Sequence, residues 1–217
     1  MLKKILDGVS AGIMISIGCA IFLASENKVV GSVLFSVALL IICYKGFSLY
    51  TGKVGFIPLS HTKEDFSVLL LGLFGNFIGV VACSFLLGLA MPEMKEKAIQ
   101  MCNSKLTQQW YQTFIRSIFC GVLMYVAVYV FKEKKSISGI VYAIPVFILS
   151  GFEHSIADMG YFGVSHMVSF DAFLFIVIAI VGNAIGGMAL PLISLVNIKQ
   201  GKSQSTKEVN NENEKAS

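Results

Sequence analysis

Residues 172–196 read AFLFIVIAIVGNAIGGMALPLISLV, an uncharged apolar run long enough to cross the roughly 30 Å hydrocarbon core of a bilayer as a helix. Comparable uncharged runs occupy Val29–Tyr44 and Phe66–Met91. Over the whole chain of 217 residues, 55% are hydrophobic and only 14% are charged, far less charge than the surface of a soluble domain requires. The sequence therefore predicts an all-α membrane protein.

Hydropathy predicts six transmembrane helices, over residues 5–24, 30–50, 66–91, 112–131, 136–157 and 170–196. Together they would form one pore domain, residues 1–196. The rest of the chain, 197–217, is rich in Lys, Glu, Asn, Gln and Ser and cannot bury a core, so we expect a disordered tail. We expect a multi-pass protein of the plasma membrane. The placement of Lys and Arg favours both termini in the cytoplasm, although the lysines of segment 92–110 weaken this bias.

An internal repeat relates the two halves of the chain. Gly46-Phe47 and Gly55-Phe56 recur as Gly151-Phe152 and Gly160-Tyr161. Residues 75–79, GNFIG, recur at nearly the same offset as residues 182–186, GNAIG. Two matches in the same order indicate two halves of three spans each. Because three is odd, the halves must have opposite orientations, and such inverted repeats are typical of channels and transporters.

Spans two and five each contain a sequence that interrupts a membrane helix. Span two continues from Leu49-Tyr50-Thr51 through Gly52 and Lys53 to Gly55, and span five continues from Glu153-His154 through Asp158 to Gly160. Irregular backbone and ionisable side chains at membrane depth occur where they line a wet cavity or are buried in protein. Since the two breaks occupy equivalent places in the repeats, we expect them to face each other across a pore.

These motifs resemble the formate/nitrite transporter family. The matching residues are Leu49-Tyr50-Thr51-Gly52, Gly75-Asn76, Glu153-His154, Gly182-Asn183 and Gly186-Gly187. The resemblance covers roughly residues 5–196 and implies a homopentamer with an aquaporin-like pore in each protomer. It also implies that the break in span two gates the pore. The family's central histidine, here His154, would lie between two hydrophobic constrictions and govern proton-coupled passage of weak acids.

The sequence departs from the family pattern in several places. The family's vestibule lysine before span four aligns with Gln109, and its Cys-Asn or Ala-Asn in span four is Met124-Tyr125. The family's asparagine four residues after the histidine is Asp158, and Lys53 lies in the first break. A lost vestibule cation and an added acid in the pore leave the selectivity for anions open.

The expected site is built around the two breaks. The solute pathway is expected to include Leu49, Tyr50, Thr51, Lys53, Asn76, His154, Asp158 and Asn183. Glu153, Gly52, Gly55 and Gly160 are expected to support the breaks structurally. We expect His154 to exchange a proton in the pore rather than to be an ordinary buried histidine. Lys53 and Asp158, at equivalent repeat positions, would either pair across the pore axis or each reach water in its own vestibule.

Candidates for the hydrophobic constrictions are Leu49, Phe74, Phe77, Phe85 and Phe175, of which Leu49 adjoins a break. Arg116 and Lys105 are either interfacial anchors or substitutes for the missing vestibule lysine. The five cysteines show no spacing typical of a metal site, and we find no nucleophile–base pair or phosphate loop. We therefore expect no enzyme activity, no cofactor, no metal and no nucleic-acid partner.

The predicted function is a membrane channel or transporter for a small monovalent anion or its neutral weak acid, of the formate, nitrite or hydrosulfide type, with a proton link through His154. Its partners would be membrane lipids, the solute and further copies of the chain. Two alternatives stay open: a pore for a neutral or cationic small solute, favoured by Asp158, and a membrane scaffold or sensor that transports nothing.

Overall fold

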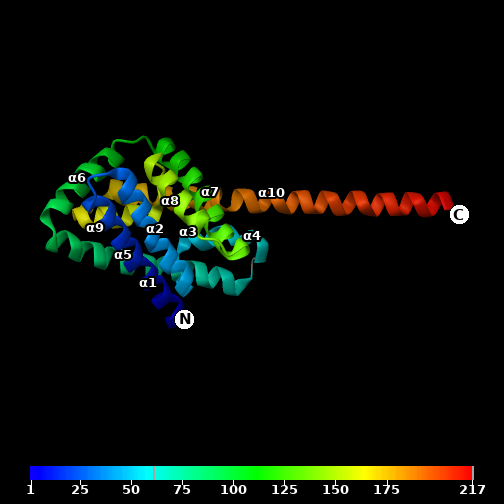
Figure 1. Ribbon diagram of the computed structural model, residues 1–217, viewed down its shortest axis with the longest axis horizontal. Helices are drawn as coiled ribbons and strands as arrows, with labels where there is room; N and C mark the ends of the chain where they lie inside the picture. Colours follow the sequence, from blue (N-terminus) through cyan, green and yellow to red (C-terminus); the bar gives the residue numbers. More distant parts are fainter. Residues whose placement is uncertain (61, 217) are drawn as a thin grey trace.

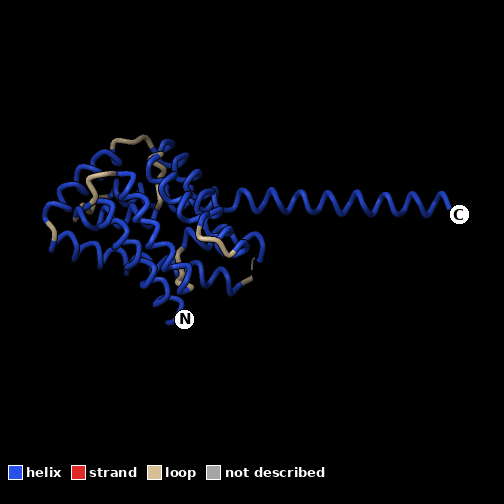
Figure 2. Tube along the Cα trace, in the orientation of Figure 1, coloured by secondary structure: helices blue, strands red, loops and turns tan. Residues whose placement is uncertain are grey.

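The computed structural model describes residues 1–60 and 62–216, and it describes side chains as far as Asn197. Within these residues all regular structure is helical (Figures 1 and 2). The elements are α1 (Leu2–Ala24), α2 (Lys28–Lys45), α3 (Tyr50–Lys53), η1 (Val54–Phe56), α4 (Ile57–Ser60), α5 (Lys63–Ala90), α6 (Pro92–Leu106), α7 (Trp110–Lys134), α8 (Ser138–Leu149), α9 (Ser155–Ser165) and α10 (Phe170–Ala216).

Five described helices are long and apolar enough to cross a membrane: α1, α2, α5, α7 and the first part of α10, Phe170–Asn197. The chain is accordingly an all-α, multi-pass membrane protein, as predicted. The expected fifth span, 136–157, is divided, because α8 ends at Leu149 and the chain resumes as α9 at Ser155. A count of six spans requires α8 and α9 to cross together, and it stays a prediction.

Local sequence signals fix where several helices begin. The side chain of Asn27 caps α2 by accepting hydrogen bonds from the backbone N–H groups of Val29 and Val30, at 2.9 and 3.2 Å. Thr62 and Asp65 form a capping box at the start of α5. Pro92 begins α6, where its missing N–H costs nothing. These caps separate α5 from the preceding short helices and α6 from α5.

The repeated glycine-asparagine segments mark two close helix crossings. A Cβ atom at Gly75 of α5 would come within 2.3 Å of the carbonyl oxygen of Ile5 in α1, and one at Gly186 of α10 within 1.8 Å of that of Ile118 in α7. Only glycine permits the backbones to approach so closely. The pairs α1–α5 and α7–α10 are thus equivalent units, one in each half of the chain.

Different helices lie at the two ends of the bundle. In Figure 1, α6 and α9 lie at one end, while α3 and α4 lie toward the other, where α10 continues away from the other helices. The helix extends to Ala216. The expected disordered tail, 197–217, falls almost wholly in the part whose side chains are not described, and its disorder stays a prediction.

Candidate functional site

Two non-helical segments interrupt the helices at equivalent places. The first break, residues 46–49, follows α2, and the second break, residues 150–154, follows α8. Gly46 and Gly151 have φ angles of +71° and +68°, in the left-handed region that favours glycine. Each is followed by a phenylalanine whose N–H returns to the helix, Phe47 to Ile42 and Phe152 to Phe147, both at 3.0 Å. The repeated Gly-Phe dipeptide is therefore a helix terminator used twice.

A buried asparagine holds each break in place. Asn76 Nδ2 donates to the carbonyl oxygens of Ser48 and Gly8 at 2.7 and 2.9 Å, and its Oδ1 accepts from the N–H of Tyr50 at 2.9 Å. These bonds satisfy backbone groups that the interrupted helix leaves without partners. The structure thus gives Asn76, expected along the solute pathway, a backbone-supporting position.

Asn183 makes the same set of bonds in the other half. Its Nδ2 donates to the carbonyl oxygens of Glu153 and Ser117 at 2.9 and 2.8 Å, and its Oδ1 accepts from the N–H of Ser155 at 2.9 Å. Both asparagines are fully buried. Asn183 is therefore also a support for backbone, and the repeat extends from sequence to hydrogen bonding.

The two breaks meet at Thr51 and His154. Thr51 Oγ1 lies 2.8 Å from His154 Nε2, and His154 Nδ1 accepts a hydrogen bond from the N–H of Ala157 at 3.1 Å. Because Nδ1 accepts, the proton of a neutral ring lies on Nε2, which then donates to Thr51. His154 thereby caps α9, is only 2% exposed and stacks on Phe147 with ring centroids 5.5 Å apart.

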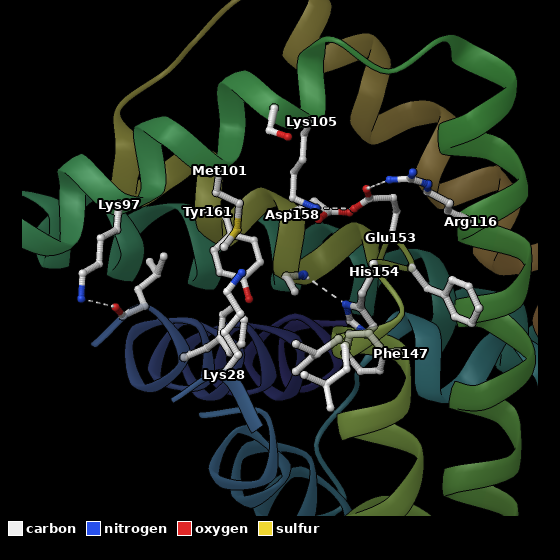
Figure 3. A pocket seen from close by; sticks show the side chains of 18 of the residues that line it. Lys28, Lys97, Met101, Lys105, Arg116, Phe147, Glu153, His154, Asp158 and Tyr161 are labelled. Atoms are coloured by element: carbon white, nitrogen blue, oxygen red, sulfur yellow. Dashed lines mark hydrogen bonds and ion pairs between the residues drawn. The ribbon is translucent and has the colours of Figure 1, made fainter. Parts of the chain in front are cut away.

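A cavity of about 800 Å³ reaches His154 (Figure 3). It lies between the second break, α6, α9 and the α1–α2 connection, and His154, Ala157 and Asp158 are among the residues that line it. Its charged lining residues are Glu26, Lys28, Lys97, Lys105, Arg116, Glu153 and Asp158. An aqueous solute in this cavity would meet a strongly polar wall directly above the histidine.

Lys105 reaches from α6 to two acids in the cavity (Figure 3). Its Nζ forms ion pairs with Glu153 Oε2 and, at 2.9 Å, with Asp158 Oδ1. Gln108 Nε2 donates to Glu153 Oε1 at 2.7 Å, while Arg116 Nη1 lies 4.0 Å from the same oxygen. Burial lowers the pKa of Lys105, but the charges of Asp158 and Glu153 outweigh it and raise that pKa above its usual value. Lys105 is therefore a permanent cation shared between two carboxyl groups.

Of the two alternatives for Lys53 and Asp158, pairing across the pore axis is contradicted, because Asp158 pairs with Lys105. The nearest charges to Lys53 are those of Lys132, Asp7 and Asp65. The reason is geometric. From the meeting point, α3 and α4 lead to the start of α5, whereas α9 leads to its end, where His166 contacts the carbonyl oxygen of Phe85. Equivalent positions beyond the breaks therefore diverge toward opposite ends of the bundle.

Gln109, the residue matched to the family's vestibule lysine, is not among the residues that line the cavity. Gln109 instead caps α7 through reciprocal hydrogen bonds with Gln112. Lys105, which we weighed as a substitute, lies in the cavity with only 14% of its side chain exposed. Gln108, which we missed, shares the second carboxylate oxygen of Glu153. Gln108 lies beyond the end of α6, in the connection to α7, so helical spacing along the sequence could not have related it to Lys105.

The remaining predicted residues fall into two groups. Leu49 and Tyr50 are buried beside the first break, and the Tyr50 hydroxyl donates to the carbonyl oxygen of Ile180 at 3.2 Å. The glycines support close packing. A Cβ atom would come within 3.3 Å of a Val128 methyl group at Gly52, 2.6 Å of the Gly187 carbonyl oxygen at Gly55 and 2.9 Å of Cys19 Sγ at Gly160.

The phenylalanines proposed for constrictions differ in exposure. Phe175 is buried, whereas Phe74 and Phe77 of α5 are 54% and 50% exposed, which places them on the outside of the bundle. Phe85 is 45% exposed and stacks on His166. Leu49 and Phe175 therefore remain as constriction candidates. Within the part of the chain that the structure describes, no three His, Cys, Asp or Glu side chains gather as metal ligands would.

Comparison with known proteins shows which family shares this architecture. Residues 1–197 match the sequence model of the family described as formate/nitrite transporter. The formate channel FocA of Haemophilus influenzae is 22% identical over 71% of this chain, and the formate-nitrite transporter of Plasmodium ovale is 29% identical over 78% of it. The solved structure described as a pentameric formate channel with formate bound superposes with a TM-score of 0.73 at 21% identity, covering 92% of this chain and 97% of that one.

The match is partial in length for the curated relatives. It spans 63% of the Haemophilus protein and 64% of the Plasmodium protein. The likeness to the solved channel extends over nearly all of both chains and shows a shared fold. With the family match covering all the apolar helices, the chain belongs to the formate/nitrite transporter family.

Proposed function

We propose that the protein is a channel for a small monovalent anion or its neutral weak acid, of the formate, nitrite or hydrosulfide type. The observation that carries the proposal is the cavity of about 800 Å³ that reaches His154, which contacts Thr51 beside the first break. The formate/nitrite transporter family, and its relatives described as formate channels, support the same class of solute.

The proposed mechanism depends on the cost of moving charge into an apolar passage. Beyond the polar cavity, a solute reaches His154 with Phe147 stacked on its ring, and Leu49 lies beside the other break. Transfer of an ion into such surroundings costs several kcal/mol or more, whereas transfer of a neutral acid that keeps a hydrogen bond costs far less. The Nε2–H of His154 would supply that hydrogen bond by exchanging Thr51 for the solute, and the N–H of Ala157 would hold the ring in the required tautomer.

The assembly and the setting are part of the same proposal. Helices α1, α2, α5, α7 and α10 carry large apolar side chains that are exposed in the single chain, among them Val37, Leu70, Leu86, Phe119 and Phe173. Lipid and neighbouring protomers of a homopentamer would cover them. We place both termini in the cytoplasm of a plasma-membrane protein, so that the cavity beneath α6 is the outer vestibule.

Asp158 supports a second candidate, a pore for a small cation or a neutral solute, because it adds an acid to the vestibule. Purified protein in liposomes separates the candidates when uptake of formate, ammonium and glycerol is measured side by side. The first proposal expects formate uptake well above that of protein-free vesicles. Ammonium or glycerol uptake without formate uptake would favour the second, and silence for all three solutes would favour a membrane scaffold or sensor.

A further inference from the structure

Two buried carboxyl groups share one cation at the floor of the outer vestibule (Figure 3). Glu153 and Asp158 are 2% and 1% exposed, and both contact Lys105 Nζ. If both acids were ionised, a negative charge would remain beside the lysine. Arg116 is 4.0 Å from Glu153, and its side chain is 44% exposed, so water screens much of its charge.

The hydrogen-bond donors are unequally divided between the two acids. Both oxygens of Glu153 have a donor, Lys105 for Oε2 and Gln108 for Oε1. Asp158 Oδ1 has Lys105, but no donor among the described residues reaches Asp158 Oδ2. A buried carboxylate oxygen without a donor is costly, about 1–3 kcal/mol or more. Of the four oxygens, Asp158 Oδ2 is the one that gains most from binding a proton.

The two carboxyl groups also lie close to each other, because each has an oxygen in contact with the same ammonium nitrogen, Lys105 Nζ. Two acids at such a distance cannot both ionise cheaply, and one proton held between them removes the repulsion. With that proton in place, one carboxylate and one ammonium remain, so the buried cluster is neutral.

We propose that Glu153 and Asp158 hold one exchangeable proton, carried on Asp158 Oδ2, and that this proton is passed to a weak-acid anion entering the vestibule. The transfer to the solute rests on the proposed function, whereas the proton site itself does not. The O–H bond of Asp158 breaks as an O–H bond forms on the anion, which leaves two carboxylates beside Lys105 and one net negative charge in the cluster. A proton from water in the cavity restores the starting state.

The geometry favours Asp158 over His154 as the proton donor. The ring of His154 is committed at both nitrogens, to Thr51 and to the N–H of Ala157, so giving up or adding a proton breaks a cap or the contact between the breaks. Asp158 lines the cavity, and its Oδ2 carries no comparable commitment. His154 then keeps its proton and donates its Nε2–H to the solute only in exchange for Thr51, whereas Asp158 decides whether that solute is neutral.

The other titratable groups around Asp158 come from four elements. They are Cys19 of α1, Cys102 and Lys105 of α6, Cys120 and Arg116 of α7, and Tyr161 of α9, besides Glu153 and His154. Thiols and a phenol are neutral near physiological pH. Among these groups, the positive charge of Lys105 therefore directly opposes protonation of Asp158, and the negative charge of Glu153 favours that protonation.

Infrared spectroscopy of the purified protein tests the proton site without any transport. We expect the carbonyl band of a protonated carboxyl group at neutral pH, and we expect carboxyl-¹³C-aspartate to shift it. Asp158→Asn should remove the band, while Asp171→Asn, an exposed aspartate of α10, should leave it unchanged. Absence of the band, persistence in Asp158→Asn, or a shift only with labelled glutamate would overturn the proposal. Isotope labelling of the wild type keeps this test valid even if Asp158→Asn fails to fold.

Liposome uptake of formate driven by an inward proton gradient tests the transfer. We expect Asp158→Asn to slow gradient-driven uptake by about tenfold or more, since a positioned proton donor contributes at least that much. Unchanged gradient-driven uptake in this variant would overturn the transfer step. A wild-type protein that shows the infrared band but transports no formate would contradict the proposed function and leave the proton site supported.

Discussion

The first and second breaks share a backbone and differ in chemistry. In both, a glycine at positive φ ends the helix, a phenylalanine N–H closes it, and a buried asparagine bonds two carbonyl groups and one N–H. The side chains at equivalent positions are unrelated. Ser48 corresponds to Glu153 and Lys53 to Asp158, so one half carries a hydroxyl group and a cation where the other carries two acids.

This comparison separates the residues that build the pore from those that give it chemistry. Glycine and asparagine solve a backbone problem that both halves share, namely unpaired N–H and C=O groups inside a membrane. The side chains that face the vestibule do not have this task and differ between the two halves. Among the described residues, the ionic cluster lies at the second break, where the acids pair with Lys105 of α6. Four substitutions sharpen or break this view.

The largest effect is expected from Lys105→Met. It would leave Glu153 and Asp158 buried without their cation, which typically costs about 3–5 kcal/mol. We expect a marked fall in the thermal unfolding temperature in detergent, and recovery when Glu153→Gln and Asp158→Asn are added. Lys97→Met is the matched control, since Lys97 Nζ donates only to the carbonyl oxygen of Leu23. Equal loss in both lysine variants would show that the cluster has no special role.

The stabilising charge of Lys105 also has a predictable pH range. Its pKa is raised in the folded protein, so its contribution is fully present below the ordinary lysine value of about 10.4 and is lost only as the pH rises through the higher folded value. The destabilisation caused by Lys105→Met should therefore be constant across neutral pH.

The second substitution tests the equivalence of the halves. Asn76→Ala and Asn183→Ala each remove the partner of two carbonyl groups and one N–H. Because the backbone can relax and some of these groups can find other partners, we expect a net cost of about 1–3 kcal/mol. We expect similar losses of thermal stability in the two variants. Asn27→Ala, at the exposed cap of α2, should cost less, about 1 kcal/mol. A large loss in only one of the buried pair would break the proposed equivalence.

The third substitution concerns the glycines that end α2 and α8. Ala at Gly46 or Gly151 meets open space but must adopt a positive φ, which costs roughly 1–2 kcal/mol. We expect equal, moderate decreases in thermal stability, with Asn tolerated better than Ala at both positions. If Ala proved neutral, the positive φ angles would not be required for the breaks.

The smallest change in stability is expected from Thr51→Val, which keeps the shape of the side chain and removes the hydrogen bond to His154. It should cost about 0.5–1.5 kcal/mol and alter the dependence of formate uptake on pH, whereas Thr51→Ser should preserve both. An unchanged uptake profile in Thr51→Val would mean that the contact between the breaks does not govern the solute.

The sequence was most informative where repetition has one physical cause. The paired Gly-Phe dipeptides and the GNFIG and GNAIG segments predicted two equivalent halves, and the structure ends a helix at Gly46 and at Gly151. The interruptions themselves were expected too late in the sequence, because most of 49–55 and 153–160 is helical, in α3, η1 and α9. The all-helical membrane fold followed from the apolar runs. The role of the asparagines was not predicted, because sequence does not show whether a polar side chain faces a pore or a broken backbone.

The sequence was least informative about partners distant along the chain. Pairing of Lys53 with Asp158 was one of two alternatives, suggested because they occupy equivalent repeat positions. In the structure the breaks meet, but the segments that follow them lead to opposite ends of the bundle. The partner of Asp158 came instead from α6, a polar helix outside the repeat. Its contribution depends on how it folds back over the vestibule, and no local pattern specifies that.

One measurement tests most directly whether the solute passes where the two breaks meet. Formate uptake into liposomes is recorded for Thr51→Cys before and after addition of Cd²⁺, which the introduced thiolate and His154 would bind together. We predict uptake before the addition, block by Cd²⁺ and recovery with a chelator, with little block of the protein that retains Thr51. Uptake that is insensitive to Cd²⁺ in Thr51→Cys would contradict passage between Thr51 and His154.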